Sequence, residues 1–533
     1  MLDASPPRLA DLLHWRDLKD IDAAAALLMD ALAADWRILI VGDFDADGAT
    51  GVAVGVSGLK MLGARQVDYL VPDRVVYGYG LSPALAQLAL QRQPQLLITV
   101  DNGISSLEGV AAMRAAGVRV IVTDHHLPGE SLPAADAIVN PNQPGDTFAS
   151  KNLAGVGVMF YLLAALRSRL AETGALPRDA PKLSSLLDLV ALGTVADLVP
   201  LDANNRILVA AGLARMQAGR ARPGIRALLA VAGREPRRIA ASALGFALGP
   251  RINAAGRLEH MDRGIECLLA PDMARAQPLA EELDAINRQR REMQDDMQLA
   301  ALEQLAGRLD ASAAGLCVQA DDWHEGIVGL IASRLKEEHH RPAVAFAPTA
   351  DGQLKGSARS VPGFHLRDAL ALIDARHPGL IEKFGGHAMA AGLSLARDNF
   401  APFAAAFESV CAAGLSEEMK TALWLSDGAL AAGEISAANA QLLAAGGPWG
   451  QGFEEPQFDN EFEVVSQRIV GSGHLKLRLR AAGAEAVLDA IAFGVSQTLP
   501  PGPQRLVYQL DLNDYYDPPG LQLIVRGAGL AAD

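Results

Sequence analysis

The sequence predicts an α/β protein with a parallel-sheet domain, a long connecting helix, a second α/β domain and a C-terminal β-barrel. From Arg37 onward, short apolar runs alternate with helical segments, which is typical of a parallel sheet. From Leu279 to Met297, apolar residues recur at three- to seven-residue spacing, which predicts one long helix. In the C-terminal region, strand-like segments are separated by Gly, Pro and Asn, as in a small barrel.

The expected elements follow from these patterns. Strands of the first sheet are expected at residues 37–41, 67–71, 96–100 and 118–122, with helices near Thr50 to Leu62, from Ser82 and from Ser105. A helical region rich in Leu and Ala should extend from about Leu153 to Leu269. In the second α/β region we expect strands at 316–320 and 343–347 and a helix at 326–335. Barrel strands are expected at 461–465, 473–480, 486–493, 505–512 and 521–527.

Domain boundaries are placed where the pattern changes: 1–270 for the catalytic domain with its helical part, 271–310 for the connecting helix, 311–415 for the second α/β domain and 416–533 for the barrel. The N-terminus has no secretory signal pattern, and no later stretch is apolar enough for a membrane span. We therefore expect a cytoplasmic protein with no membrane partner. The three cysteines form no CxxC pair, which argues against disulfides and a structural zinc site.

The net charge of −15 argues against general adhesion to nucleic acid. Charge is unevenly distributed, however. Ten arginines stand against three acids between Leu213 and Arg263, which makes that stretch about +7. Such a stretch could form a surface that follows the phosphates of a nucleic acid. The alternative interpretation is an ordinary solvated helix face.

Acids and imidazoles follow three of the expected strands. Because the carboxyl ends of parallel strands meet at one edge of a sheet, these residues should converge there. Carboxylates so close together are held ionised most readily by divalent cations. The residues in question are Asp43, Asp45 and Asp47 on an expected turn, Asp101, and Asp124 with His125 and His126.

The mixture of carboxylates and imidazoles favours two Mn²⁺ ions, with Mg²⁺ as a substitute. A pair of such ions suits the hydrolysis of phosphoesters. A calcium loop of the EF-hand kind is disfavoured, because Val54 stands where that loop needs Glu. A nucleotide triphosphate motor is disfavoured as well, because the chain has no GxxxxGK[ST] motif.

Four segments resemble the ordered motifs of the DHH phosphoesterase superfamily: DFDADG at 43–48, TVDNG at 99–103, TDHH at 123–126 and ALGTVADLVPL at 191–201. GGHAMAAG at 385–392 resembles the signature of the associated DHHA1 domain. Together with GPRINAAGR at 249–257, DWHEGIVGLIASRL at 322–335 and GPWGQGFEEP at 447–456, it narrows the resemblance to RecJ exonucleases. This resemblance covers nearly the whole chain and implies that the barrel is an OB-fold.

The resemblance also implies roles for individual residues. The implied metal ligands are Asp45, Asp47, Asp101, His125 and Asp197, with Asp101 bridging two ions. Many family members carry His where this chain has Val41, which leaves Asp43 either as a ligand or as a residue that orients one. His126 would either contact the scissile phosphate or transfer a proton.

Phosphate contacts are implied in the same way. Arg74, Arg257, Ser357 and Arg359 would bind the terminal 5′-phosphate, with surface salt bridges as the alternative. Gly385, Gly386 and His387 offer backbone N–H groups to a phosphate, and a tight turn is the competing interpretation. In the barrel, strand periodicity places His474, Lys476, Arg478 and Arg480 on one face, which suits single-strand binding, and a solvated edge is the alternative.

The leading hypothesis is a hydrolase that degrades single-stranded DNA from its 5′ end to 5′-mononucleotides, in DNA repair and recombination. A single-stranded-DNA-binding protein and a recombination helicase are the partners that the resemblance implies, and we expect a monomer. Two alternatives remain: a DHH enzyme acting on short oligonucleotides or cyclic dinucleotides, and a non-enzymatic scaffold. The basic barrel strand argues against the first, and the presence of every expected acid argues against the second.

Overall fold

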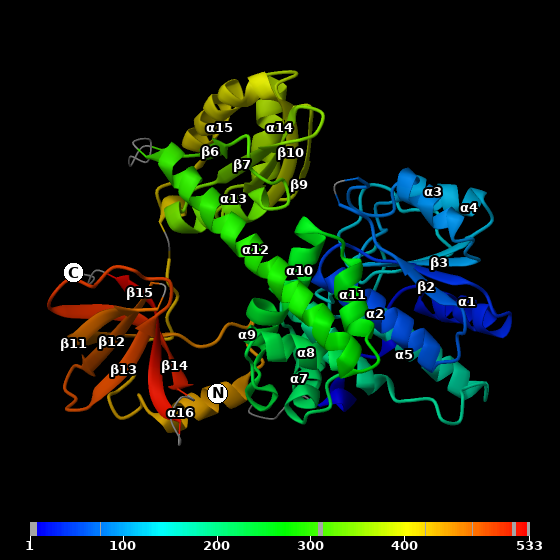
Figure 1. Cartoon of the computed structure of the whole chain (residues 1–533), viewed down its shortest axis with the longest axis horizontal. Helices are drawn as coiled ribbons and strands as arrows, with labels where there is room; N and C mark the ends of the chain where they lie inside the picture. The colour runs from blue at the N-terminus through cyan, green and yellow to red at the C-terminus, as the bar shows by residue number, and fades with distance from the viewer. Residues whose placement is uncertain are drawn as a thin grey trace. The chain divides into compact units, whose positions relative to one another are not determined.

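The computed structural model describes residues 8–74, 76–306, 313–421, 423–471, 473–513 and 519–529. The chain forms two compact units. The first unit combines residues 1–284 with residues 424–533, and the second comprises residues 285–423. Figure 1 shows the elements of each unit.

The first unit contains a five-stranded sheet of order β2-β1-β3-β4-β5, and every strand pair in it is parallel. Its strands are β1 Ile38–Val41, β2 Val67–Leu70, β3 Leu96–Val100, β4 Arg119–Thr123 and β5 Ala137–Val139. Its helices are α1 Ile21–Ala33, α2 Ala46–Met61, α3 Pro83–Gln91, α4 Leu107–Ala115 and α5 Gly155–Glu172. The predicted parallel sheet is confirmed, and β5 is an additional strand that the apolar pattern did not predict.

The expected start of helix α2 was wrong. The helix begins at Ala46 instead of near Thr50, because Asp45 caps it. Oδ1 of Asp45 accepts hydrogen bonds from the backbone N–H groups of Asp47 and Gly48, at 2.9 and 3.0 Å. Asp47 was expected on a turn, but it lies in the first turn of this helix.

Helices follow the first sheet, as expected. They are α6 Leu187–Ala196, α7 Ala203–Gln217, α8 Pro223–Val231, α9 Ala241–Ala243, the π-helical turn η5 Leu244–Leu248, α10 Gly249–Leu258 and α11 Asp262–Leu269. The predicted long helix is α12, Met273–Leu305, and its residues Leu279 and Leu283 are buried. Short 3₁₀ turns are η1 Leu9–Asp11, η2 Trp15–Asp17, η3 Leu183–Leu186, η4 Pro236–Arg238, η6 Arg397–Asn399 and η7 Glu418–Lys420.

The second unit contains a mixed sheet of order β6-β7-β8-β10-β9, in which only the β6–β7 pair is parallel. Phe346, Phe403 and Phe407 are buried in its core. The helix expected from Gly326 begins at Val328. Its elements are β6 Leu316–Gln319, α13 Val328–His339, β7 Ala343–Pro348, β8 Gln353–Arg359, α14 Leu366–Arg376, β9 Lys383–Gly386, β10 Ala390–Ala396 and α15 Phe400–Gly414.

The C-terminal strands close into a barrel of order β11-β12-β13-β15-β14, because β14 also pairs with β11. This confirms the predicted β-barrel. Leu475, Leu477 and Leu479 are buried in its core, as the alternation in their strand predicts. Its elements are α16 Ala437–Gly446, β11 Phe458–Val470, β12 His474–Ala481, β13 Val487–Ala492, β14 Pro503–Asn513 and β15 Gly520–Gly529.

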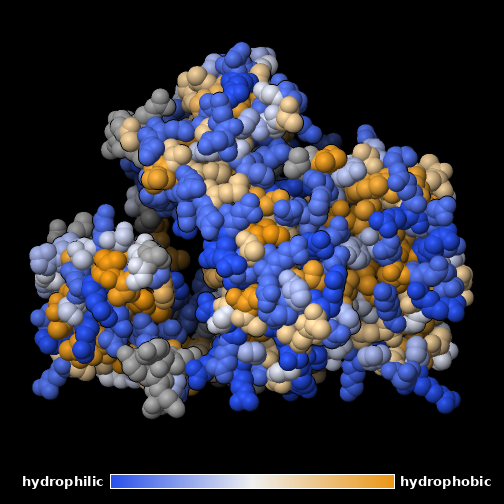
Figure 2. All heavy atoms as spheres, viewed as in Figure 1, coloured by the Kyte–Doolittle hydropathy of each residue, from blue (hydrophilic) through white to orange (hydrophobic). Residues whose placement is uncertain are grey.

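Hydrophilic residues are spread over the face shown in Figure 2, with hydrophobic residues in groups between them. Within the described ranges, no helix is both long and apolar enough to cross a membrane. The cysteines Cys267, Cys317 and Cys411 are all free.

Candidate metal centre

The first acids of the site follow strand β1. Asp43 is buried, and the chain turns at once into helix α2. Gly48 allows this tight path, because a Cβ there would lie 2.6 Å from the backbone N and O of Asp43. The loop therefore holds Asp43, Asp45 and Asp47 close together at the carboxyl edge of the sheet.

Asp47 is fixed by the N-terminus of helix α5. Its Oδ2 accepts a hydrogen bond from the N–H of Gly155 at 2.6 Å, and its Oδ1 accepts one from Val156 at 2.9 Å. Gly155 also lies against Asp101, since a Cβ on Gly155 would come within 2.5 Å of the Asp101 Cβ. The Gly155–Gly157 segment thus packs around two acids of the site.

His125 joins acids from three elements. Its Nε2 lies 3.0 Å from Oδ1 of Asp101, 3.5 Å from Oδ2 of Asp197 and 3.9 Å from Oδ2 of Asp47. Asp197 is the residue that ends helix α6, and Asp101 follows β3 in a left-handed conformation, with φ 63°. Strand ends and one helix end therefore bring together residues that are far apart in the sequence.

Asp124 and His126 lie next to this cluster and contact each other. Oδ1 of Asp124 accepts hydrogen bonds from the N–H groups of His125 and His126 and lies 2.8 Å from Nδ1 of His126. The Tyr79 hydroxyl donates to the carbonyl of Asp101 and lies 2.9 Å from the same Nδ1. Asp124 therefore fixes the tripeptide in place.

Helix α10, which carries the GPRINAAGR motif, supports the acidic loop. Oδ1 of Asn253 accepts a hydrogen bond from the N–H of Ala46 at 2.7 Å. Gly256 allows close approach, because a Cβ there would lie 1.9 Å from the carbonyl oxygen of Phe44. The guanidinium of Arg74 lies over the Phe44 ring, 4.6 Å from its centroid. The motif therefore positions the loop, and Arg257 stands in the same helix.

Burial raises the pKa values of the clustered acids, since a carboxylate loses its hydration there. The pKa of Asp47 is raised to about 7, first by burial and then by the charge of Asp45. Burial first, and neighbouring carboxylates second, raise the pKa values of Asp43, Asp101 and Asp197 well above the usual range. Burial lowers the pKa of the His125 imidazole to about 4.

These properties fit a divalent metal centre. A neutral imidazole at His125 has a lone pair to donate. Within the described part of the chain, Oδ1 of Asp43 and Oδ2 of Asp197 are buried without a hydrogen-bond partner. A cation would satisfy both oxygens and offset the repulsion among the carboxylates. Three groups have ligand atoms within 4.8 Å of one another: Asp101, His125 and His126; Asp47, His125 and Asp197; and Asp43, Asp45 and Asp101.

Several expected phosphate contacts lie together on the sheet of the second unit. Ser357 and Arg359 stand two residues apart on β8, and Nη1 of Arg359 donates to Oγ of Ser357 at 3.0 Å. Ser357 pairs with Gly392, which pairs in turn with Gly385. These residues therefore form one lateral row across three strands.

Gly386 and His387 begin a tight connection between β9 and β10. The N–H of His387 donates to the carbonyl of Ala390 at 2.8 Å. At Gly386, φ is 142° and a Cβ would lie 2.5 Å from the Cα of Ala391. The conformation of the hairpin therefore accounts for a glycine at position 386. The N–H of His387 already has a backbone partner.

The barrel carries the expected basic strand face, although acids offset part of it. Lys476 lies opposite Arg468 on β11. Arg478 lies 3.8 Å from Asp489, and Arg480 forms a 2.7 Å ion pair with Glu463. The arginine-rich stretch from Leu213 to Arg263 is also offset by ion pairs, which include Arg222 with Asp188, Arg251 with Asp284, and Arg263 with Glu282.

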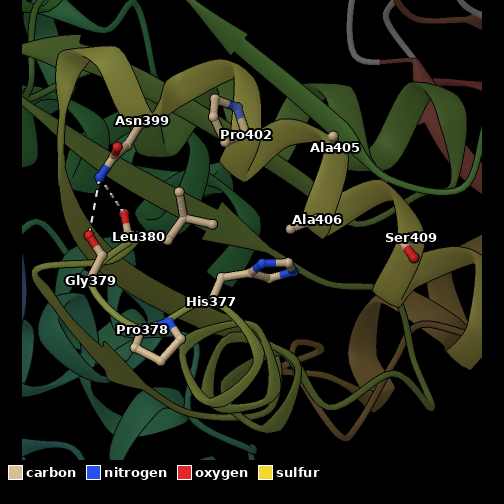
Figure 3. Close-up of a pocket in the computed structure, with 9 residues that line it drawn as sticks. All are labelled: His377, Pro378, Gly379, Leu380, Asn399, Pro402, Ala405, Ala406 and Ser409. Carbon is tan, nitrogen blue, oxygen red and sulfur yellow. Dashed lines mark hydrogen bonds between the residues drawn. The ribbon is translucent and has the colours of Figure 1, made fainter.

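One cavity of the second unit contains none of the site residues named above. It has a volume of about 630 Å³ and belongs to the second unit, where it is lined by residues such as His377, Asn399 and Ser409. In Figure 3, Asn399 donates to the carbonyls of Gly379 and Leu380, both at 3.2 Å. No acid is among its lining residues, so the cavity lacks the clustered carboxylates of the metal centre.

The chain matches three family models. The DHH family, N-terminal domain, model covers residues 37–194, the DHHA1 domain model covers 312–413 and the RecJ OB domain model covers 426–527. The fold and the acidic cluster thus define a DHH-type protein with an attached OB domain.

Similarity to whole proteins is more specific. The chain is 51% identical over 529 residues to the single-stranded-DNA-specific exonuclease RecJ of Dickeya dadantii, covering 97% of this chain and 92% of that protein. Identity to the Escherichia coli protein of that name is 50%, covering 96% and 91%. The crystal structure of RecJ from Thermus thermophilus in complex with Mn²⁺ is similar at TM-score 0.81 and 31% identity, covering 97% of this chain and 72% of that one. The chain belongs to the RecJ family of single-stranded-DNA-specific exonucleases.

Some residues of the site were not singled out by the sequence patterns. Tyr79 follows a turn that carries no periodic signal, yet its hydroxyl contacts both Asp101 and His126. Asn253 stood inside a motif whose role was open. Gly155 stands outside all the motifs that the sequence offered. Each of these contacts depends on the fold bringing distant segments together.

Proposed function

We propose that this protein hydrolyses single-stranded DNA from its 5′ end and releases 5′-mononucleotides. One observation carries the proposal: buried carboxylates from two strand ends and a helix end surround the neutral imidazole of His125, whose Nε2 lies 3.0 Å from Asp101 and 3.5 Å from Asp197. Such a cluster suits two divalent cations and phosphoester hydrolysis. Family relatives that carry the name single-stranded-DNA-specific exonuclease support the choice of substrate.

Asp45, Asp47, Asp101, His125 and Asp197 would hold Mn²⁺, with Mg²⁺ as a substitute. Bound metal supplies an activated water and neutralises charge on the phosphoryl group. Structures of RecJ from Thermus thermophilus in complex with Mn²⁺ and with Mg²⁺ support the choice of these metals. Asp43 is buried at the same edge of the sheet, and its own carboxylate would direct a further oxygen toward the cluster.

His126 would act on the scissile phosphate, either as a hydrogen-bond donor or in proton transfer. Its Nδ1 lies 2.8 Å from Asp124, and the hydrogen bond and charge of that carboxylate outweigh burial and raise the pKa of His126. A protonated imidazole beside a phosphate donates a charge-assisted hydrogen bond. Asp124 would therefore be a positioning residue.

The 5′ to 3′ direction of degradation would come from recognition of the 5′-phosphate of the strand. We propose this role for Arg74, Arg257, Ser357, Arg359, Gly385, Gly386 and His387, where the N–H of His387 would exchange the carbonyl of Ala390 for the phosphate. A guanidinium fits a phosphate with two parallel hydrogen bonds, and the pairing of Arg359 with Ser357 holds two donors side by side. Lys476 and Arg478 of the barrel would hold the strand farther from its end.

The cellular process, compartment and partners are proposed from this activity. We propose DNA repair and recombination in the cytoplasm, with a single-stranded-DNA-binding protein and a recombination helicase as partners of a monomer. The domain division at 1–270, 271–310, 311–415 and 416–533 likewise stays a proposal.

The test is digestion of a long single strand labelled at its 5′ end, with Mn²⁺, by the intact protein and by Asp101→Ala. We expect immediate release of labelled mononucleotide, which the substitution abolishes. If the label is retained while the 3′ side shortens, the proposed direction is wrong. Preferential cleavage of dinucleotides would favour the short-substrate alternative, and binding without hydrolysis would favour a scaffold.

A further inference from the structure

Three exposed apolar side chains surround one cavity in the first unit. The cavity has a volume of about 380 Å³, and its walls come from the end of helix α6, the π-helical turn η5, residues 449–457 and the barrel. The three side chains are Leu198, Phe246 and Trp424, which are 66%, 84% and 52% exposed. Large apolar groups gathered in the open around one hollow indicate a binding surface.

Leu198 ties this cavity to the metal centre. It follows the cluster residue Asp197 directly, and Val195 and Val199 line the same cavity. Leu198 has a φ of 61°, a left-handed conformation that is uncommon for a residue with a Cβ. Backbone strain of this kind occurs most often at functional sites. The turn thus holds an acid toward the cluster while the next side chain lines the cavity.

Phe246 stands in a π-helical turn, Leu244–Leu248. Single π-helical turns are rare and occur frequently at functional sites. The neighbouring residues Leu244, Ala247 and Leu248 are buried, whereas Phe246 is directed outward. The extra residue in this turn therefore exposes an aromatic ring.

Residues of the GPWGQGFEEP motif form another part of the cavity wall. The Trp449 and Phe453 rings are stacked, with centroids 4.8 Å apart, and Arg206 lies over Phe453 at 3.7 Å. The N–H of Leu201 donates to the carbonyl of Gln451 at 2.7 Å. The motif thereby fixes the segment before the barrel against helix α7 and forms one side of the cavity.

Trp424 completes the apolar rim on the barrel side. It lies against Gly527 of β15, where a Cβ would come within 2.7 Å of the indole ring. The indole ring therefore packs against the backbone of the barrel at Gly527. Phe246 and Trp424 are both flat aromatic groups that line the cavity, and they come from two separate stretches of the chain.

The polar groups of the cavity select against a phosphate. Glu454 and Glu455 line it, and burial, followed by the charge of Asp511, raises the pKa of Glu455. Arg526 is already engaged, since Nε and Nη2 both donate to Oε1 of Gln509, at 2.8 and 2.6 Å. The site thus combines an apolar platform with amide and carboxyl groups and suits a flat, uncharged ligand that forms hydrogen bonds.

We propose that this cavity binds a nucleobase of the single-stranded substrate, with Phe246 and Trp424 as stacking platforms. This inference rests on the proposed function and extends it. Every base has a π-face, so the site would accept all four bases, as an enzyme that degrades strands of any sequence requires. Two observations favour the substrate strand over an apolar peptide from a partner: Leu198 of the cavity is the chain neighbour of Asp197, and the cavity contains amide and carboxyl groups as well as apolar ones.

The test measures binding of intact protein, under chelator, to single strands that carry one abasic nucleotide at successive distances from the 5′ end. With the native chain we expect one or two positions at which the missing base weakens binding about 5- to 100-fold, the effect of one stacked base. Phe246→Ala and Trp424→Ala should weaken binding of the complete strand to a similar extent and should lose the positional effect. Phe246→Tyr should retain it.

Leu442→Ala, which removes a 70% exposed apolar side chain on α16 outside the cavity, is the control and should change nothing. Unchanged binding and an unchanged abasic profile in both aromatic variants would overturn the inference. That result remains distinct from failure of the proposed function, since native protein with Mn²⁺ would still digest the strand. Circular dichroism of each variant distinguishes loss of a contact from loss of the fold.

Discussion

Nδ1 of His126 lies 2.8 Å from Oδ1 of Asp124, which also accepts the backbone N–H groups of both histidines. Oδ2 of the same carboxylate accepts the N–H of Ile104 at 2.9 Å. Both oxygens of Asp124 are therefore occupied by protein donors, in contrast to Oδ1 of Asp43 and Oδ2 of Asp197. Although Asp124 stands in the same motif as His125, its contacts suit it to orient the imidazoles rather than to hold metal.

Asp124→Asn tests this role. The amide keeps the size of the side chain but removes the negative charge beside His126, and we expect kcat to fall about 10- to 100-fold, as for other groups that orient active-site ligands. The alkaline limb of the rate profile should shift to lower pH, because the pKa of His126 loses the carboxylate that raises it. Asp35→Asn, in an exposed pair with Arg65, is the control. An unchanged rate and pH profile would contradict the assignment.

Gly155→Ala tests the packing of helix α5 against the acids. The new Cβ would lie 2.5 Å from the Cβ and 2.8 Å from the Cα of Asp101, and neither atom belongs to a flexible chain end. We expect a loss of about 1–3 kcal/mol in the free energy of unfolding and a marked loss of activity. Denaturant unfolding and strand digestion measure the two effects. Gly129→Ala, where nothing lies within 4 Å, should be neutral; equal effects in both variants would refute the argument.

The sequence could predict the parallel sheet, the long helix and the barrel because each depends on a local pattern. Alternation places Leu475 inside and Lys476 outside, and the structure agrees. Convergence of Asp43, Asp101 and His125 was predictable as well, because parallel strands of one sheet end at the same edge. The start of helix α2 was mispredicted, since capping by Asp45 adds a turn that apolar spacing does not record.

What the sequence could not predict depends on contacts between distant segments. Nothing near Tyr79 indicates that its hydroxyl contacts Asp101 and His126. The charge of Arg480 is offset by Glu463 because the strand register places the two residues opposite each other. Composition alone does not predict that pairing. The cavity around Phe246 likewise requires the barrel to stand beside the helical region.

The metal-free protein should lose stability as pH rises from about 6.5 through the neutral range. A carboxyl whose folded pKa is raised contributes stability below its unfolded value, and that contribution is lost as pH rises through the folded pKa. Asp47 contributes to this loss until pH passes its folded pKa of about 7, and His126 and the other acids of the cluster contribute because their folded pKa values are raised too. His125, at about 4, is neutral throughout this window and does not contribute to the trend.

Thermal unfolding at several pH values, with chelator and then with Mn²⁺, measures this dependence. Metal binds the ionised acids, so Mn²⁺ should raise Tm most at the alkaline end. The Asp101→Asn variant should show a flatter dependence without metal, because one raised carboxyl is gone. A metal-free Tm that rises across this window, or that Mn²⁺ leaves unchanged, would show that the cluster does not hold these acids as inferred.

Lys476→Ala tests the barrel as a surface for the DNA backbone. Each phosphate neutralised on a single strand contributes about −0.7 to the slope of log affinity against log salt, so the slope should become shallower by about that amount. Arg480→Ala should have a smaller effect, because Arg480 is already paired with Glu463 at 2.7 Å. Fluorescence anisotropy over a series of salt concentrations measures both slopes. Equal slopes for the native protein and Lys476→Ala would remove Lys476 from the interface.

Arg359→Lys tests recognition of the 5′-phosphate. Nη1 of Arg359 is held by Oγ of Ser357 at 3.0 Å and by the carbonyl of Ala358 at 2.9 Å, which leaves a guanidinium of defined orientation on β8. Lysine keeps the charge but cannot donate two parallel hydrogen bonds, so preference for 5′-phosphoryl over 5′-hydroxyl ends should fall about 10- to 100-fold. Competition between the two substrates measures the preference. Arg397→Lys, at an exposed ion pair with Asp321 in the same unit, is the matched control. If Arg359→Lys keeps the full preference, the 5′-phosphate is recognised by other groups.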